Sequence, residues 1–298
     1  MNFANIGYLF YKSYYDNFSP KDWSNLISAD EGEGEGKEKA TISELAQRSI
    51  AIINNNIIYY RFDSSLVDYL DLNRITGNLS IELKTTYPGL LLGSGYSHAA
   101  GRIDEEFKLG FYFDHTTGMP VIPGSSVKGI IRSAFPGSSK SFTEDEKKQR
   151  EQYIKWILKE NHVEEDVDVY GLEMEIFMGK RTETQESGKK KFIPVPLAQR
   201  DIFFDAYIIA SENKGGVFMG EDFITPHKHK SNPALDSFAN PNPIKFLKIL
   251  PGVTFRFQFD LKNNGKLQGF QKLKLFKKII LDLGVGAKTN VGYGHLVK

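Results

Sequence analysis

Four glycines, a lysine and a threonine lie within the eleven residues 284–294, a composition that suits the binding of an anion. Glycine reaches positive φ at low cost and lets a ligand approach the main chain, where successive N–H groups can hold a phosphate. A helix C-cap followed by a tight turn would explain the first glycine but not the rest. The segment therefore predicts a phosphate-binding loop with the contacts Gly284, Gly286, Lys288, Thr289, Gly292 and Tyr293.

The two familiar nucleotide motifs do not match this loop. A dinucleotide fingerprint requires a third glycine where Thr289 stands, and a P-loop requires a glycine directly before its lysine, where Ala287 stands. The order of elements also differs, because the loop follows an expected helix and leads into an expected strand, the reverse of both motifs. These mismatches disfavour a nucleotide-binding enzyme.

A second candidate anion site is the start of an expected helix over 124–135. Ser125 or Ser126 can accept hydrogen bonds from the first free N–H groups, and an exposed helix start favours a negative charge. Lys128 and Arg132 are four residues apart and therefore share one face, opposite an apolar face. An ordinary capped amphipathic helix with two solvated cations explains the same pattern equally well.

The overall composition is that of a globular protein, with 298 residues, 40% hydrophobic and 25% charged, and a net charge of only +1. Charge is nevertheless segregated, because residues 262–298 hold eight lysines against one acid and no arginine. Lysine without arginine favours diffuse attraction to phosphates over the reading of base edges. The chain has no cysteine, no apolar stretch near the roughly 20 residues of a membrane span, and a start too polar for a signal peptide. We therefore expect a cytoplasmic protein with no membrane association and no cofactor.

Alternation and helical spacing predict the elements that must position these residues. Strands are expected at 78–87, 201–209, 253–261 and 291–297, and helices at 124–135 and 266–283. The resulting order, βαββαβ, is that of the ferredoxin-like α+β fold, which RNA-recognition modules also use. A fold does not determine a function, so this order alone decides nothing about RNA.

We expect one domain spanning 1–298, with core elements at about 78–136 and 200–298. Insertions are expected at about 88–123, with a hairpin at 107–123, at 137–199, with helices at 143–161 and 170–178, and at 211–250. Before the core, helices are expected at 3–18, ending near Ser19-Pro20, and from Thr41 or Ser43, where Ser43 can cap, to about 54. A flexible acidic loop at 30–38 is expected between them.

Two glycine-containing segments together resemble a known family. They are IPGSSVKGIIR at 122–132 and GVGAKTNVGYG at 284–294, and their pairing resembles the RAMP superfamily of CRISPR-associated RNA-binding proteins. Within the superfamily the resemblance is strongest to the sixth Cmr subunits of type III-B effector complexes. Weaker similarities at NIGYLFY (5–11), FDAY (204–207), TPH (225–227) and PIKFL (243–247) extend it over most of the chain.

The resemblance implies a backbone subunit of a helical ribonucleoprotein that holds a CRISPR guide RNA and pairs it with target RNA, beside other Cmr RAMP subunits. It also implies a β-hairpin between the second and third core strands, a place that residues 211–250 occupy here. Related subunits hold the guide with glycine-rich elements and a basic face, which implies that Lys128, Arg132 and Lys288 face RNA phosphates. We further expect the 284–294 loop to lie beside the helix start at 124–126.

The histidines decide whether such a protein could also cut RNA, because the pKa of histidine lies near 6.5. Metal-independent cleavage needs a base near the 2′-hydroxyl and an acid near the leaving oxygen. His98, beside a glycine-rich turn, is the best single candidate, but no second catalytic group converges with it in the sequence. A non-catalytic binding protein is therefore the favoured prediction, and an endoribonuclease that processes precursor guide RNA through His98 is the alternative.

The tripeptide His227-Lys228-His229 places two possible metal ligands on one face of an extended chain. Two histidines without a third ligand are weak support for zinc, and the same residues suit a basic loop tip that touches RNA. We therefore assign His227, Lys228 and His229 to RNA binding and expect no metal. Asp205 could hold Mg²⁺, although a carboxylate at a strand end more often caps a helix or forms an ion pair.

Overall fold

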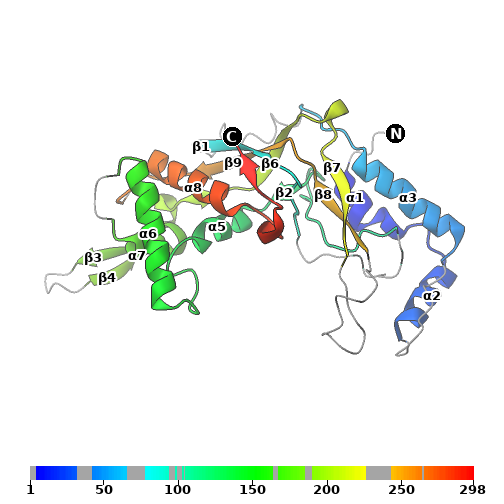
Figure 1. Ribbon diagram of the computed structural model, residues 1–298, viewed down its shortest axis with the longest axis horizontal. Helices are drawn as coiled ribbons and strands as arrows, with labels where there is room; N and C mark the ends of the chain where they lie inside the picture. The colour runs from blue at the N-terminus through cyan, green and yellow to red at the C-terminus, as the bar shows by residue number, and fades with distance from the viewer. Residues whose placement is uncertain are drawn as a thin grey trace. The chain divides into compact units, whose positions relative to one another are not determined.

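The computed structural model describes residues 5–31, 42–65, 78–93, 98, 103, 105–163, 167–184, 190–225, 243–263 and 265–298. These residues form a mixed helix and sheet protein divided into two compact units (Figure 1). Unit 1 comprises Met1–Asp63, Pro88–Val121 and Ser211–Val253, and unit 2 comprises Ser64–Tyr87, Ile122–Ala210 and Thr254–Lys298. The expectation of a single domain stays a prediction.

Unit 1 combines helices with one antiparallel strand pair. Its elements are α1 (Ile6–Tyr11), η1 (Ser13–Tyr15), α2 (Pro20–Glu31), α3 (Glu44–Ile58), η4 (Lys214–Gly216), β7 (Met219–Ile224) and β8 (Ile244–Ile249). The strands β7 and β8 pair in register from Met219 with Ile249 to Ile224 with Ile244, so the 211–250 segment contains an antiparallel pair. Helix α3 begins after Ser43, whose Oγ accepts a hydrogen bond from the Ala46 N–H at 3.3 Å, which confirms the predicted cap.

Helix α2 is an element that the sequence reading missed, because it took Ser19-Pro20 only as the end of a helix. Ser19 and Asp22 hydrogen-bond each other reciprocally, with the Ser19 N–H donating to Asp22 at 2.8 Å and the Asp22 N–H donating to Ser19 Oγ at 3.2 Å. Proline is well suited to the first helical position, where no N–H is needed. The helix continues to Glu31 and includes the first residues of the expected acidic loop, whose residues 32–38 lie outside the described part of the chain.

An aromatic core fills unit 1. Its fully buried members include Phe10, Tyr14, Phe107, Phe111 and Phe113. The alternation at 107–113 serves this burial and does not form a strand, so the predicted hairpin is reduced to its turn, which is closed by the antiparallel bridge between Phe113 and Pro120 and by the bond from the Asp114 N–H to the Met119 carbonyl oxygen. The physical reason is that the Phe113 N–H donates to the Tyr11 hydroxyl at 2.9 Å instead of to a neighbouring strand.

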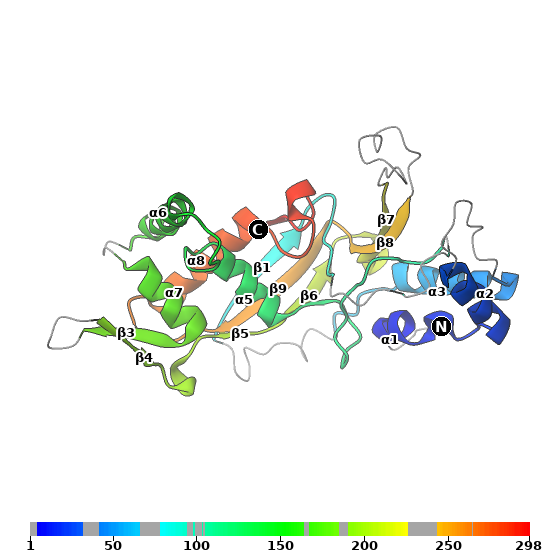
Figure 2. The ribbon, with the colours of Figure 1, turned by 90° about the horizontal axis from the view of Figure 1, so that it is seen from below.

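Unit 2 holds most of the main sheet, whose strands run side by side in Figure 2. Its elements are β1 (Leu79–Thr85), β2 (Val121–Ile122), α5 (Gly124–Ser133), α6 (Glu144–Glu160), α7 (Val169–Met178), β3 (Lys180–Thr184), β4 (Lys190–Pro194), η3 (Leu197–Gln199), β5 (Ile202–Phe203), β6 (Ala206–Ser211), β9 (Val253–Asp260), α8 (Gly269–Leu283), η6 (Thr289–Val291) and β10 (Leu296–Val297). The strand order is β10-β1-β9-β6-β2, with β5 also paired to β9. Strand β1 is antiparallel to both β9 and β10, so the sheet is antiparallel at its centre.

The core of unit 2 lies between this sheet and α8. Alternate residues of β9, including Phe255, Phe257 and Phe259, are fully buried, as the predicted alternation requires. Phe259 packs against Phe276 of α8, with ring centroids 5.7 Å apart. Helix α8 begins at Gly269, three residues later than expected, because a capping box joins Gln268 to Gln271.

Two helices of the charged 137–199 segment confirm their predictions. Helix α6 starts with a capping box between Thr143 and Glu146, and α7 follows the N-cap Asp168 and ends at Gly179 in the left-handed conformation. The hairpin of β3 and β4 was not predicted. The expected strand at 201–209 is split into β5 and β6, because Asp205 leaves the ladder to cap α5. None of the helices in the described ranges is both long and apolar enough to cross a bilayer.

Candidate nucleic-acid interface

The glycine loop after α8 closes on its own backbone. The Val285 N–H donates to the carbonyl oxygen of Gly294 at 2.9 Å. Gly284 and Gly294 have φ values of +72° and +74°, and a Cβ at Gly294 would overlap the Val285 carbonyl oxygen. At these two positions glycine is therefore required by the loop itself, whereas the sequence reading attributed the close approach to a ligand.

Lys288 stands at the turn of this loop in a conformation that side chains seldom adopt. Its φ of 59° and ψ of 34° lie in the left-handed region, which costs a residue with a Cβ about 1–2 kcal/mol. The turn continues as η6, with the Val291 N–H donating to the Lys288 carbonyl oxygen at 3.1 Å. Lys288 is half-exposed, and no acid in the described ranges pairs with it, so its ammonium is available to an anion. Tyr293 is only 8% exposed and packs inward.

The start of α5 already holds an anion supplied by the chain. Asp205 Oδ1 accepts a hydrogen bond from the Gly124 N–H at 2.6 Å, and no serine side chain caps the helix. The predicted capping by Ser125 or Ser126 is therefore wrong, and both residues lie exposed in the first turn. Because a carboxylate occupies the positive end of the helix dipole, a phosphate would have to displace it. The alternative reading of Asp205 as a helix cap is confirmed.

Lys128 and Arg132 of α5 belong to a group of three cations whose third member is Arg200. Lys128 is half-buried, with its Nζ 5.7 Å from the centroid of the Phe203 ring. Burial lowers the pKa of Lys128 below its ordinary value, and the positive charges of Arg132 and Arg200 lower it further, while Asp201 opposes them. A bound anion would relieve this repulsion, so the group is chemically suited to a phosphate.

Arg132 belongs to this group and also forms an ion pair with a buried acid. Its Nε lies 3.5 Å from Glu173 Oε1, and the Glu173 side chain is 2% exposed. Burial raises the pKa of Glu173, while a hydrogen bond from the Gly137 N–H and the charge of Arg132 lower it. Lys128 and Arg200 are therefore the members of the group whose positive charge is less compensated by an acid. No sequence pattern links Arg200 to this group, because its proximity to Lys128 comes from the tertiary fold.

The register of the sheet places the two motifs at different levels. The start of α5 lies at the level of Ser80 on β1. A Cβ at Gly124 would overlap the Phe203 carbonyl oxygen, and the next residue, Phe204, donates its N–H to the carbonyl oxygen of Gln258, which pairs with Ser80. The glycine loop lies at the level of Thr86, because His295, the residue after the loop, accepts a hydrogen bond from the Thr86 N–H. Ser80 and Thr86 are six residues apart on one strand, roughly 20 Å. The expectation that the loop lies beside the start of α5 is not confirmed.

The basic C-terminal segment is less uniform than its composition suggests. Lys272 is 1% exposed and donates to both carboxylate oxygens of Asp201, at 2.8 and 3.0 Å. Lys262 pairs with Asp260 at 2.6 Å, and Lys278 with Asp282 at 2.6 Å. Part of the segment's charge is therefore used within the fold, and only the remaining lysines can attract a polyanion.

The family model of the RAMP superfamily matches residues 82–297. The chain belongs to the RAMP superfamily. It is 28% identical over 201 residues to the CRISPR system Cmr subunit Cmr6 of Pyrococcus furiosus, covering 61% of this chain and 58% of that protein. It is also 28% identical over 257 residues to the Cmr6 subunit of Saccharolobus solfataricus, covering 86% of this chain and 69% of that protein. The first alignment thus spans less than two thirds of the relative.

A solved structure shares the fold of this RAMP protein. One chain of the cryo-EM structure of the Type III-B Cmr-beta bound to cognate target RNA superposes with a TM-score of 0.53 at 24% identity. The match covers 91% of this chain and 78% of the other. The RAMP assignment and the resemblance to the sixth Cmr subunits, both expected from the sequence, are confirmed.

In this RAMP protein the ring of His98 is half-buried among aromatic side chains. Its ring stacks on Tyr14 with centroids 3.8 Å apart, and its two nitrogens face the carbonyl oxygens of Phe107 at 3.0 Å and Phe10 at 2.8 Å. Burial lowers the pKa of His98, against the effect of these hydrogen bonds. Both ring nitrogens are thus engaged by main-chain oxygens, and the alternative assignment of His98 as a catalytic residue stays a prediction.

The expected loop residues His227, Lys228 and His229 lie outside the described part of the chain. Among the described residues, no group of three or more histidine, aspartate or glutamate side chains is arranged to hold a metal ion. RNA contact by the predicted residues stays a prediction; among them, the cationic side chains Lys128, Arg132 and Lys288 are half-exposed.

Proposed function

We propose that this RAMP protein is a guide-RNA-binding backbone subunit of a type III-B Cmr ribonucleoprotein. In this role it holds the guide, helps to position target RNA, contacts other Cmr subunits in a helical complex and does not itself cut RNA. The similarity to two proteins named Cmr6 supports the choice of complex. The alignments cover only part of each Cmr6, whereas the proposed role applies to the whole subunit.

The observation that carries RNA binding is the group of cations around Lys128. The positive charges of Arg132 and Arg200 disfavour the charged form of Lys128, an effect that Asp201 only partly opposes, and Arg132 also pairs with Glu173. Such an arrangement is costly without a bound anion and favourable with one. Lys288, held in a strained turn with its ammonium available, supplies a second contact at the other level of the sheet.

We further propose that the core of the fold is ferredoxin-like. The support is the strand order β10-β1-β9-β6, in which α5 falls between β1 and β6 along the chain and α8 between β9 and β10. This is the order in which the four strands of a βαββαβ unit lie when neighbours are antiparallel. The extra strand β2 at the edge leads the chain into α5.

A double substitution tests the RNA-binding role. Lys128→Ala with Lys288→Ala should weaken binding of guide RNA and incorporation into the Cmr complex, with circular dichroism and unfolding midpoint close to wild type. Wild-type binding should fall with salt by up to about 0.9 log unit per log unit for each phosphate neutralised. A flat salt response of the wild type, or unchanged binding and assembly of the double variant, would count against the proposal.

The absence of catalysis has its own test. The purified chain is incubated with repeat RNA in EDTA, so that metal-independent cleavage is the only reaction possible. We expect intact RNA, because His98 is held between two carbonyl oxygens. Cleavage that His98→Ala abolishes would replace the binding subunit with a processing endoribonuclease.

A further inference from the structure

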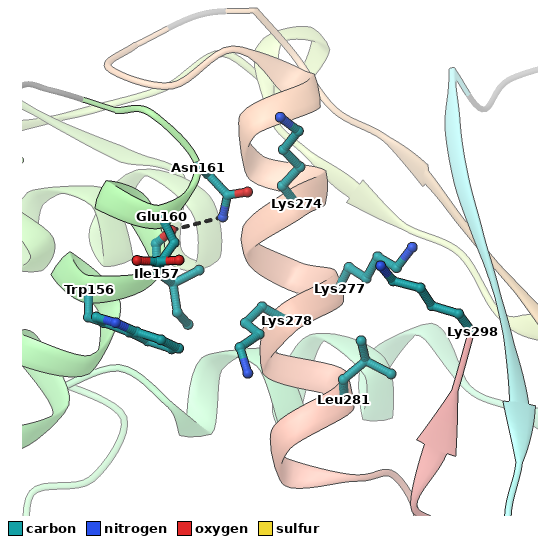
Figure 3. A pocket seen from close by; sticks show the side chains of 9 residues that line it. All are labelled: Trp156, Ile157, Glu160, Asn161, Lys274, Lys277, Lys278, Leu281 and Lys298. Atoms are coloured by element: carbon teal, nitrogen blue, oxygen red, sulfur yellow. Dashed lines mark hydrogen bonds between the residues drawn. The ribbon is translucent and has the colours of Figure 1, made fainter.

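A groove between α6 and α8 in unit 2 is lined largely by lysines. Its volume is about 460 Å³, within the range of ligand-binding pockets. Its lining includes Lys274, Lys277 and Lys278 of α8, Lys298, and Trp156 and Glu160 of α6. In Figure 3 Lys278 lies between α8 and Trp156, whereas Lys277 and Lys298 lie close together on the other side of the α8 ribbon. The groove is separate from the cations around Lys128 and from the glycine loop.

The charge of the groove is only partly compensated. Lys278 pairs with Asp282, which also accepts a hydrogen bond from the Tyr153 hydroxyl at 2.8 Å. For Lys274, Lys277 and Lys298, by contrast, no ion pair forms with any acid in the described ranges, and Glu160 is the only acid on the lining. An excess of lysines without counter-ions in a concave site attracts polyanions.

Trp156 supplies the feature that separates one kind of polyanion from another. It is 47% exposed, although a large apolar side chain of this size gains most from burial. Lys278 Nζ lies 5.3 Å from the centroid of the indole ring, and Figure 3 shows the two side chains facing each other across the groove. A flat aromatic ring beside phosphate-binding cations is the arrangement on which unpaired bases stack. The carboxylates of an acidic peptide have no flat ring that could stack on the indole.

We propose that the α6–α8 groove binds single-stranded RNA, with a base stacked on Trp156 and phosphates held by Lys274, Lys277 and Lys298. The strand must be unpaired, because bases within a duplex cover one another and cannot stack on a side chain. The lysines act as point charges and do not read sequence, so the contact is independent of base identity. This inference rests on the proposed RNA-binding function and adds a second surface to it.

Tryptophan fluorescence can report on this groove alone. The chain has two tryptophans, so Trp23→Phe leaves Trp156 as the only one in the full chain. We expect a fluorescein-labelled oligouridylate to quench Trp156 emission, and the same strand annealed to oligoadenylate to quench it far less. Polyglutamate of similar charge serves as the control for an acidic protein partner. Quenching by polyglutamate and not by RNA would overturn the proposal in favour of such a partner.

Charge-neutralising substitutions test the phosphate contacts. Lys274→Gln with Lys277→Gln should lower the salt slope of oligouridylate affinity by about 1.4, since each single-strand phosphate contact contributes about 0.7. Trp156→Phe should weaken binding mildly and Trp156→Ala several-fold, which separates stacking from folding effects. Lys148→Gln with Lys266→Gln removes the same charge from exposed sites elsewhere on unit 2 and should leave most of the slope.

The outcomes distinguish this inference from the function on which it rests. If wild-type protein binds oligouridylate but the groove variants keep full affinity and Trp156 is not quenched, the groove is not an RNA site and the proposed function stands. If wild-type protein binds no RNA at any salt concentration, the proposed function fails and the groove proposal fails with it.

Discussion

Lys288 offers a substitution that separates what the fold requires from what a ligand requires. Its left-handed conformation costs about 1–2 kcal/mol for a residue with a Cβ, and glycine would adopt it freely. Glycine also gives the unfolded chain more freedom, which offsets about 0.4–1 kcal/mol of that gain. Lys288→Gly should therefore raise the free energy of unfolding by about 0.5–1 kcal/mol while removing the positive charge.

The same variant should bind RNA less well. Losing one phosphate contact lowers the slope of log affinity against log salt by about 0.7 for a single strand, which is about fivefold weaker binding at 0.1 M salt and little change near 1 M. Urea unfolding and fluorescence anisotropy with oligouridylate measure the two quantities on one preparation. Lys266→Ala removes an exposed lysine from the same basic segment and serves as the charge control.

A stabilised Lys288→Gly protein with reduced affinity and a lower salt slope is the expected combination. A less stable variant would mean that the turn carries no strain at this position. An unchanged salt slope would mean that Lys288 does not contact phosphate, and the reason for a lysine at a position that favours glycine would have to be sought elsewhere.

Further substitutions test an ion pair, a histidine and two glycines of the fold. Asp201→Asn should lower the free energy of unfolding in urea by about 3–5 kcal/mol, because it leaves the buried Lys272 without its carboxylate. Adding Lys272→Met should recover most of the loss, and an equally unstable double variant would refute this account. Burial lowers the pKa of His98, so the stability that its neutral form provides is present above about pH 6.5 and lost as the pH falls. The difference in unfolding free energy between wild type and His98→Gln should shrink below that pH by at most about 1.4 kcal/mol per unit, and a constant difference from pH 5 to 7 would contradict the assignment. Gly294→Ala should lower the free energy of unfolding by more than about 1–2 kcal/mol, because its Cβ would overlap the Val285 carbonyl oxygen. Gly129→Ala, in α5 with open space around it, should raise the same free energy by about 0.5–1 kcal/mol. Equal effects of the two substitutions would show that the loop tolerates a Cβ.

Local signals were sufficient wherever a few neighbouring residues define an element. The capping box of Thr143 and Glu146 fixes the start of α6, and the buried alternation of β9 follows directly from its phenylalanines. The same kind of signal was present for α2, in which hydrogen bonds from Ser19 and Ser43 lower the pKa of Asp22 to about 2. Proline both ends helices and suits the first helical position, so the pair Ser19-Pro20 alone does not predict α2.

Long-range contacts account for what the sequence could not predict. Asp205 caps α5 from 81 residues away, and Arg200 reaches Lys128 from a separate part of the chain. Helical spacing places Lys272 on the buried face of α8 with Leu275 and Phe276, but nothing in the sequence identifies Asp201 as its partner. Residue types therefore indicated a basic phosphate-binding protein, but only the fold determines which cations are available to a ligand.

The division into two units has a consequence for how the chain must be made and handled. The backbone passes from one unit to the other after residues 63, 87, 121, 210 and 253, so each unit is assembled from three separate stretches of sequence. No single cut releases either unit on its own, and a truncation at any of these points leaves at least one unit incomplete. Each unit must also wait for distant stretches of the chain before it can fold, which makes folding slow and exposes incomplete intermediates to aggregation. Expression of fragments is therefore expected to fail where expression of the whole chain succeeds.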